Sequence, residues 1–155
     1  MKYEGVCIAV NDVNLAREFY EDLFGLEVFQ DYGINIAFSC GISLQQNFAW
    51  LVDIPEERVI KAPHNIELYF EEDDFDGFLE KLREYPDIRF LGAGVLEQSW
   101  GQRTVRFYDL DGYIIEVGEN LRSVVQRFLN LGMTIEETSE RMDVSVPDLE
   151  KLLSR

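Results

Sequence analysis

The sequence predicts an α+β fold made of two βαβββ modules in tandem, followed by C-terminal helices. The two halves of residues 1–119 show strand-like and helix-like segments in the same order. When Asp12 is aligned with Asp74, the halves superpose with an offset of about 60 residues. After Gly118 the pattern becomes helical. Because helix caps, strand order and turn residues agree in both halves, a duplication explains the pattern better than chance does.

The first module covers about residues 1–54 and begins with an alternating strand at 3–10. Asn11 or Asp12 can cap the helix that follows, and Gly25 can end it in the left-handed conformation. The apolar side of this helix is predicted to contain Leu15, Ala16, Phe19, Tyr20, Leu23 and Phe24. Strands are then predicted at 26–31, 34–39 and 42–46, with turns at 31–33 and 40–41.

A charged connector between Pro55 and Pro63 leads to the second module, at about residues 62–119. Residues 65–71 alternate, and Asp73 or Asp74 can cap a helix that ends near Pro86. The predicted apolar face of this helix consists of Phe75, Phe78, Leu79 and Leu82. Further strands are predicted at 88–91, 94–98, 104–108 and 113–117, with a tight turn at 109–112.

Residues 120–155 form a predicted helical extension. An amphipathic helix is expected at 121–131, a second at 135–142 after Thr134, and a third from Ser145 or Val146-Pro147. The last two resemble a helix-turn-helix, but the would-be recognition helix begins with carboxylates where phosphates would lie. We therefore expect these helices to cover the barrel or a partner subunit.

The formal net charge of −16 argues against nucleic-acid and membrane partners, because such a surface repels phosphates and anionic lipids. No apolar run reaches membrane-spanning length. Cys7 and Cys40 are interpreted as reduced thiols, since no secretory segment is evident at the N-terminus. We expect a cytoplasmic protein.

Two motifs resemble a known family. Val10-Asn11-Asp12, with Phe19-Tyr20 and Leu23-Phe24-Gly25-Leu26, is similar to the opening module of the vicinal-oxygen-chelate superfamily, which includes glyoxalase, bleomycin-resistance and dioxygenase proteins. Asp109-Leu110-Asp111-Gly112 and Glu116 resemble its closing motif, with Leu110 in place of the usual proline. Trp100-Gly101-Gln102-Arg103 also resembles members of this group. The resemblance covers about residues 1–119.

The resemblance implies that each module curls into half a barrel and that paired modules enclose a cavity. Metal-dependent members place four ligands on the first and last strands of the modules. Here these positions fall on Gly5, on Ser43 or Gln45, on Glu67 and on Glu116. Glycine offers no ligand, so the implied metal set is Glu67, Glu116 and Gln45. Oxygen ligands suit Mg²⁺, Mn²⁺ or Ca²⁺ better than Zn²⁺, and the cofactor candidates are Mg²⁺, Mn²⁺, Ni²⁺ and Zn²⁺.

Strand alternation independently places Glu67 and Glu116 in one concavity. Burial and mutual repulsion would raise the pKa of one of them, and a cation or a basic ligand would relieve both costs. The alternative is that either carboxylate simply pairs with Arg103 or Arg106.

Other residues are candidate ligand contacts. Cys7 shares a strand face with Gly5, whose missing side chain would leave space for a ligand. Phe48, Trp50, Tyr69 and Trp100 are candidate stacking walls, and Arg103 offers a planar fork for an anionic group. Each of these aromatic residues could equally serve the core.

Three functions remain open. The first is a cavity-based small-molecule binding protein of the glyoxalase/bleomycin-resistance type, without a catalytic redox metal. Analysis of the metal content of the purified protein would distinguish it from the second. The second is a metal-dependent lyase or isomerase of the lactoylglutathione lyase (glyoxalase I) type, with Glu116 and Glu67 as catalytic residues. The third is an interaction module that uses the extension. Since the resembling proteins commonly pair and module edges are unpaired, we expect a homodimer.

Overall fold

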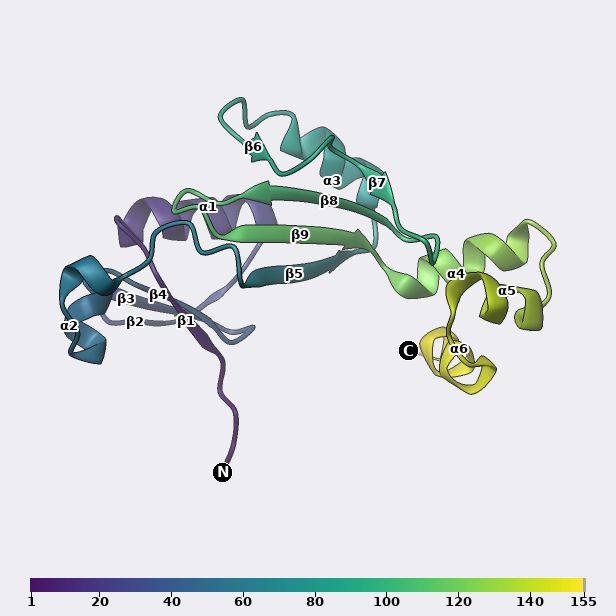
Figure 1. The fold of residues 1–155 in the computed structure, drawn as a ribbon, viewed down its shortest axis with the longest axis horizontal. Coiled ribbons are helices and arrows are strands. Elements are labelled where there is room, and N and C mark those ends of the chain that lie inside the picture. The colour runs from purple at the N-terminus through teal and green to yellow at the C-terminus, as the bar shows by residue number, and fades with distance from the viewer. Residues whose placement is uncertain (155) are drawn as a thin grey trace. The chain divides into compact units, whose positions relative to one another are not determined.

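The computed structural model describes residues 1–154 and confirms the α+β fold of two βαβββ modules with C-terminal helices (Figure 1). The chain forms two compact units. The first contains Met1–Pro63 together with Leu110–Tyr113, and the second contains His64–Asp109 and the chain from Ile114 onward. Among the described residues, no helix is both long and apolar enough to cross a membrane.

The first unit is built on a four-stranded sheet. Its elements are β1 (Val6–Ala9), α1 (Val13–Phe24), β2 (Val28–Asp31), β3 (Asn35–Phe38), β4 (Ile42–Gln45), α2 (Phe48–Val52) and the 3₁₀ turn η1 (Glu56–Arg58). The strand order is β1-β4-β3-β2, with β1 parallel to β4 and the other neighbours antiparallel. The sequence did not predict α2, because a five-residue helix is too short to display a helical period.

Helix α1 begins and ends as predicted. The carboxylate of Asp12 accepts hydrogen bonds from the backbone N–H groups of Asn14 at 2.9 Å and Leu15 at 3.1 Å, and Gly25 ends the helix with φ 64°. The buried face consists of Val13, Ala16, Phe19, Tyr20 and Leu23. The prediction was wrong at Leu15, which is 56% exposed, because it lies at the solvent edge of this stripe.

The second unit repeats this plan and adds the extension. Its elements are β5 (Glu67–Glu72), α3 (Phe75–Leu82), β6 (Arg89–Phe90), β7 (Leu96–Glu97), β8 (Arg103–Tyr108), β9 (Ile114–Glu119), α4 (Leu121–Asn130), α5 (Ile135–Met142) and α6 (Val146–Leu153). The order β5-β9-β8-β6, with β5 parallel to β9, matches the first, last, third and second strands of the first unit. The predicted duplication is therefore visible in the topology.

The middle of the second module is less regular than predicted. The strands expected at 88–91 and 94–98 are reduced to the two-residue strands β6 and β7, which both pair with β8. Gly92 and Gly94 lie between them with φ 86° and 95°. These left-handed glycines interrupt the extended backbone, so one continuous strand cannot form there.

The turn between β8 and β9 packs with the first unit. The carboxylate of Asp111 accepts hydrogen bonds from the backbone N–H of Asn11 at 2.8 Å and from its side-chain amide at 2.5 Å. The backbone N–H of Ala9 donates to the hydroxyl of Tyr113 at 3.0 Å. The closing motif therefore serves as more than a hairpin turn, because it bonds to the start of the chain.

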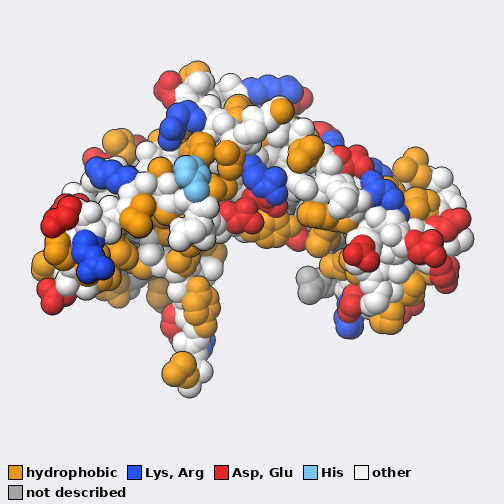
Figure 2. Space-filling view, viewed as in Figure 1, with side chains coloured by type: hydrophobic (Ala, Val, Ile, Leu, Met, Phe, Trp, Pro, Cys, Tyr) orange, Lys and Arg blue, Asp and Glu red, His pale blue; other side chains and the backbone are white. Residues whose placement is uncertain are grey.

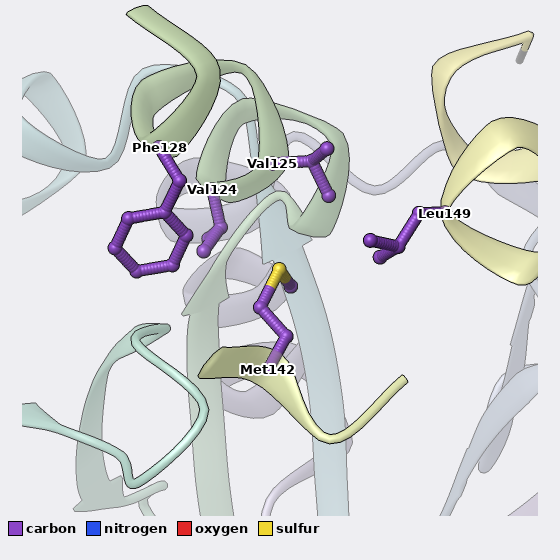
Figure 3. Packing of buried hydrophobic residues seen from close by; sticks show 5 residues of the cluster. All are labelled: Val124, Val125, Phe128, Met142 and Leu149. Carbon is purple, nitrogen blue, oxygen red and sulfur yellow. The ribbon is translucent and has the colours of Figure 1, made fainter. Parts of the chain in front are cut away.

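The three C-terminal helices enclose a small apolar core of their own (Figure 3). The buried side chains are Val124, Val125, Phe128, Met142 and Leu149. Thr134 caps α5 in a reciprocal capping box with Glu137, and Ser145 caps α6. Burying five large apolar side chains stabilises the extension by roughly 1.5–3 kcal/mol for each before chain entropy is counted.

Candidate functional site

The sheet of the second unit has one covered face and one open face. Phe78 of α3 packs on Phe107 of β8, with ring centroids 6.5 Å apart. Side chains alternate along each strand, so Arg106 and Glu116 point away from α3, and the strand register places Arg106 beside Glu116 and Glu116 beside Tyr69. We call this side of the sheet the open face.

Glu67 and Glu116 both lie on the open face, and Arg106 contacts both carboxylates. Its Nε is 4.0 Å from Glu67 Oε2, and its Nη2 contacts Glu116 Oε2. Burial raises the pKa of Glu116 and the charge of Glu67 adds to this, while the nearby Arg106 guanidinium opposes both. Of the two arginines that the sequence left open as partners, Arg106 forms this pair.

Arg103 lies on the other side of β8. Its guanidinium binds Asp76 at 2.9 Å and Glu119 at 3.2 Å, and it lies over the ring of Phe75. Arg103 therefore does not pair with Glu116, because the side chains of residues 103 and 106 point to opposite faces of the sheet. Its position beside α3 keeps it from offering a fork to a ligand on the open face.

Glu119 is a buried carboxylate that two arginines hold. Only 7% of its side chain is exposed, and Arg127 of α4 binds it at 3.0 Å in addition to Arg103. Burial alone would raise the pKa of Glu119, but the hydrogen bonds and charges of the two arginines outweigh burial and lower it. This cluster links α3, β9 and the extension.

The segment Trp100–Arg103 organises the end of the open face. Gly101 has φ 86°, and a Cβ there would overlap the ring of Phe128 in α4, so glycine allows the extension to approach. Gln102 is 3% exposed; its amide accepts from the indole N–H of Trp100 at 2.9 Å and donates to the hydroxyl of Tyr69 at 2.8 Å. The two aromatic rings are thus held by one buried amide.

This hydrogen-bonded chain continues to the edge of the sheet. The hydroxyl of Tyr69 donates to Glu71 at 3.1 Å, and burial raises the pKa of Tyr69 to about 12. Gly118 leaves the room that Gln102 occupies, because a Cβ there would lie 2.6 Å from the amide nitrogen. Tyr69 is therefore a neutral hydrogen-bonding group at any physiological pH.

A groove of about 700 Å³ lies where the open face meets the extension. Tyr69, Trp100, Gln102 and Glu116 line it from the sheet side. Three of the residues that the sequence nominated therefore meet in one cavity. Glu67 does not line the groove, although its charge reaches Glu116.

The first unit carries a smaller cavity of about 420 Å³ on its own open face, opposite α1. Cys7 and Ser43 line it, side by side in the register of β1 and β4. Gly5 lines the same cavity and is exposed, in agreement with the predicted open space beside Cys7. Its φ is 149°, and a Cβ there would overlap the backbone of Gly41, so the missing side chain also permits a close backbone approach.

Gln45 and Trp50 lie elsewhere in the first unit. Gln45 is 2% exposed, and its amide oxygen accepts a hydrogen bond from Asn35 at 2.9 Å while its amide nitrogen donates to the backbone of Gln46. Trp50 is on α2 and is 72% exposed, whereas its neighbour Phe48 lines a cavity of about 140 Å³. Trp50 is therefore not a stacking wall within its unit.

The divalent metal that the family resemblance implies does not fit these donors. Position 5 has no side chain, Gln45 uses its amide oxygen on Asn35, and Glu116 is bound by Arg106. Within the described part of the chain, no three His, Cys, Asp or Glu side chains are grouped to hold an ion. A catalytic site needs about three protein ligands and an open position, so these residues do not supply one.

Sequence reasoning did not nominate Gln102, Glu119 or Arg127. The alternation of side chains along β8 is a signal that could have identified Gln102, because residues 102, 104 and 106 point to the same face of the sheet. Glu119 and Arg127 gave no such signal, since a charge pair eight residues apart spans a strand end and a helix.

Comparison with known proteins supports the fold and confirms the family that the sequence motifs resemble. Residues 3–122 match the model of a glyoxalase-like domain. A protein of unknown function from Agrobacterium tumefaciens is 32% identical, with a TM-score of 0.66 over 77% of this chain and 94% of that one.

Two further solved structures share the fold at lower identity. A glyoxalase/bleomycin resistance protein/dioxygenase family enzyme from Burkholderia phytofirmans is 15% identical, with a TM-score of 0.64 over 77% of this chain and 98% of that one. A lactoylglutathione lyase from Agrobacterium tumefaciens is 23% identical, with a TM-score of 0.55 over 74% and 90%. The family match ends at residue 122, near the start of the helical extension.

Proposed function

Because the chain belongs to the glyoxalase-like domain family, we propose that it binds a small organic molecule in the groove of the second unit, without a catalytic redox metal. The observation that carries this proposal is the groove of about 700 Å³ in which Tyr69, Trp100 and Glu116 meet. Ligand sites for molecules of drug size typically have volumes of about 300–1,000 Å³ and combine apolar walls with a few fixed polar groups.

The groove walls are preorganised for binding. Gln102 fixes the indole of Trp100 and the hydroxyl of Tyr69, so both side chains are already held in place and lose little entropy on binding. Arg106 pairs with Glu116 and lies 4.0 Å from Glu67, so one positive charge already stands where a metal cation would bind the two carboxylates. Both facts favour a binding site over a metal centre.

A metal-dependent lyase or isomerase of the glyoxalase I type is the second candidate. One observation favours it: burial raises the pKa of Glu116, and a carboxyl group with a raised pKa is suited to general acid–base catalysis. In that case Glu116 and Glu67 would be catalytic residues. The ion pair with Arg106 opposes this role, because it favours the charged form of Glu116 and so offsets part of the rise in pKa.

Metal content, turnover and binding of a neutral probe separate these functions. We expect protein purified without chelator to carry far less than one divalent ion per chain by mass spectrometry. It should not turn over the hemithioacetal of methylglyoxal and glutathione. The neutral fluorophore N-phenyl-1-naphthylamine should bind, and Trp100→Leu should weaken its binding by about tenfold, since the ring supplies much of the apolar wall.

The matched control is Trp50→Leu, which removes an exposed indole from the first unit and should leave binding unchanged. A stoichiometric divalent ion that is lost in Glu116→Gln, together with turnover, would replace the binding function with the lyase. Probe binding that is equal in both tryptophan variants would place the ligand outside the groove.

A cytoplasmic homodimer completes the proposal. Free Cys7 and Cys40 suit a reducing compartment, and the net charge of −16 argues against nucleic acid and membrane as partners. Each sheet has unpaired edge strands, which a second copy can cover. We expect light scattering to give twice the 18.0 kDa mass of one chain; the mass of a single chain would contradict the dimer.

A further inference from the structure

One wall of the groove comes from the helical extension. Met142, Val144 and Leu152 line it together with Tyr69 and Trp100. The family match ends at residue 122, and the similar structures from Agrobacterium and Burkholderia cover 77% of the chain. The extension therefore adds an apolar wall to a site whose other wall belongs to the shared fold.

The extension is firmly attached beside the groove. Arg127 donates to the backbone carbonyl of Gly101 at 2.7 Å, and Phe128 packs where Gly101 has no side chain. Arg141 binds Glu97 at 3.1 Å and donates to the backbone carbonyl of Ser99. These contacts hold α4 and α5 against the loop that carries Trp100, and Trp100 itself packs against the apolar core of the extension.

The charged residues that line the groove are mostly acidic. Arg141 is paired with Glu97, and Glu116 is paired with Arg106. Glu140 and Asp143 are exposed at the rim, and neither has an ion-pair partner within residues 1–154. After the pairs cancel, these two carboxylates set the sign of the local potential. Figure 2 shows further acidic side chains over the C-terminal helices.

We propose that the extension closes the groove and that the two walls together select an organic cation with an aromatic or other apolar body. The inference rests on the proposed binding function and specifies its ligand class. The rings of Trp100 and Tyr69 attract a cation through their faces, and Met142, Val144 and Leu152 take up the apolar body. Glu140 and Asp143 favour positive charge and repel anions of the same shape.

Two ions of nearly equal size and shape but opposite charge test whether the groove prefers a cation to an anion. In a Trp50→Phe background, Trp100 is the only indole, so its fluorescence reports binding at the groove. We expect tetraphenylphosphonium to bind at least about tenfold more tightly than tetraphenylborate. N-phenyl-1-naphthylamine serves as the neutral reference for the groove itself.

A double variant that removes two negative charges from the extension tests the contribution of the extension to this preference. Glu140→Gln with Asp143→Asn should reduce the preference for the phosphonium ion by about fivefold or more. Asparagine tolerates the left-handed backbone of position 143, where φ is 55°. The matched control, Glu136→Gln with Glu150→Gln, changes the charge equally at exposed positions outside the groove and should leave the preference intact.

Equal binding of the two ions, or a preference that both double variants leave unchanged, would overturn the cation selectivity. The neutral probe would still bind in that case, so the proposed binding function would stand. If none of the three probes changes the fluorescence of Trp100, the binding function itself fails and the inference fails with it.

Discussion

Replacing Glu119 with glutamine is expected to lower the free energy of unfolding by about 3 kcal/mol, because it leaves two partly buried guanidinium groups without their carboxylate. Glu119 is 7% exposed and binds Arg103 at 3.2 Å and Arg127 at 3.0 Å. Since Arg127 belongs to the extension, the loss should also loosen the wall of the groove. In the Trp50→Phe background, denaturant titration followed by the fluorescence of Trp100 measures the loss of stability, and binding of N-phenyl-1-naphthylamine reports the change in the groove.

The effect of this substitution should depend on pH in one direction. The folded protein lowers the pKa of Glu119 below its unfolded value of about 4.3, so the stabilisation is fully present above that value. It is lost as the pH falls through the lower pKa of the folded state. The difference in unfolding free energy between the wild type and Glu119→Gln should therefore shrink below about pH 4.

Glu97→Gln is the control for this experiment. Glu97 pairs with Arg141 of the extension, but half of its side chain is exposed, so its loss should cost less than about 1 kcal/mol. Equal destabilisation by the two substitutions would contradict the special role of the buried carboxylate. A pH-independent effect of Glu119→Gln would contradict its ionised state.

The second large effect is expected at Gly5, where alanine should cost about 3 kcal/mol of unfolding free energy. Position 5 has φ 149°, and a Cβ there overlaps the backbone of Gly41, so β1 must shift away from β4. The same constraint applies to histidine, which would otherwise appear to restore a family ligand. We expect Gly5→His to be destabilised and to gain no affinity for divalent ions.

Gly33→Ala separates backbone strain from steric overlap. Gly33 also has a left-handed backbone, with φ 81°, but open space surrounds the position of its Cβ. Its substitution should cost only the strain, about 1 kcal/mol. If Gly5→Ala and Gly33→Ala have equal denaturation midpoints, the close approach to Gly41 does not contribute to stability.

The sequence predicted the fold well because the signals were local and repeated. Asp12, Gly25 and Thr134 are caps whose partners lie within a few residues, and each is used as expected. The order of helices and strands along the chain followed from duplication, which one sequence can reveal by itself, whereas the order of strands within each sheet was first seen in the structure. Where the pattern was weak, as in the five residues of α2, no helix was predicted.

The site was harder to predict because side-chain partners are not local. Alternation placed Glu116 on the open face, and the same rule separates Arg103 from Arg106, although both were open as partners of the carboxylates. Gly5 lines a cavity with Cys7 as expected, but its close approach to the backbone of Gly41 was not predicted, because a glycine in a sequence does not reveal what packs against it. The wall formed by the extension depends on tertiary packing that periodicity does not encode.

The turn after β8 has a consequence for dissection of the chain. Asp111 and Tyr113 bond to Asn11 and Ala9, so a stretch of the second module belongs structurally to the first unit. No single proteolytic cut can release the two units as separate continuous fragments. A nick in the connector should leave the halves associated, and an isolated N-terminal fragment should fold only when a peptide spanning the turn is supplied in trans.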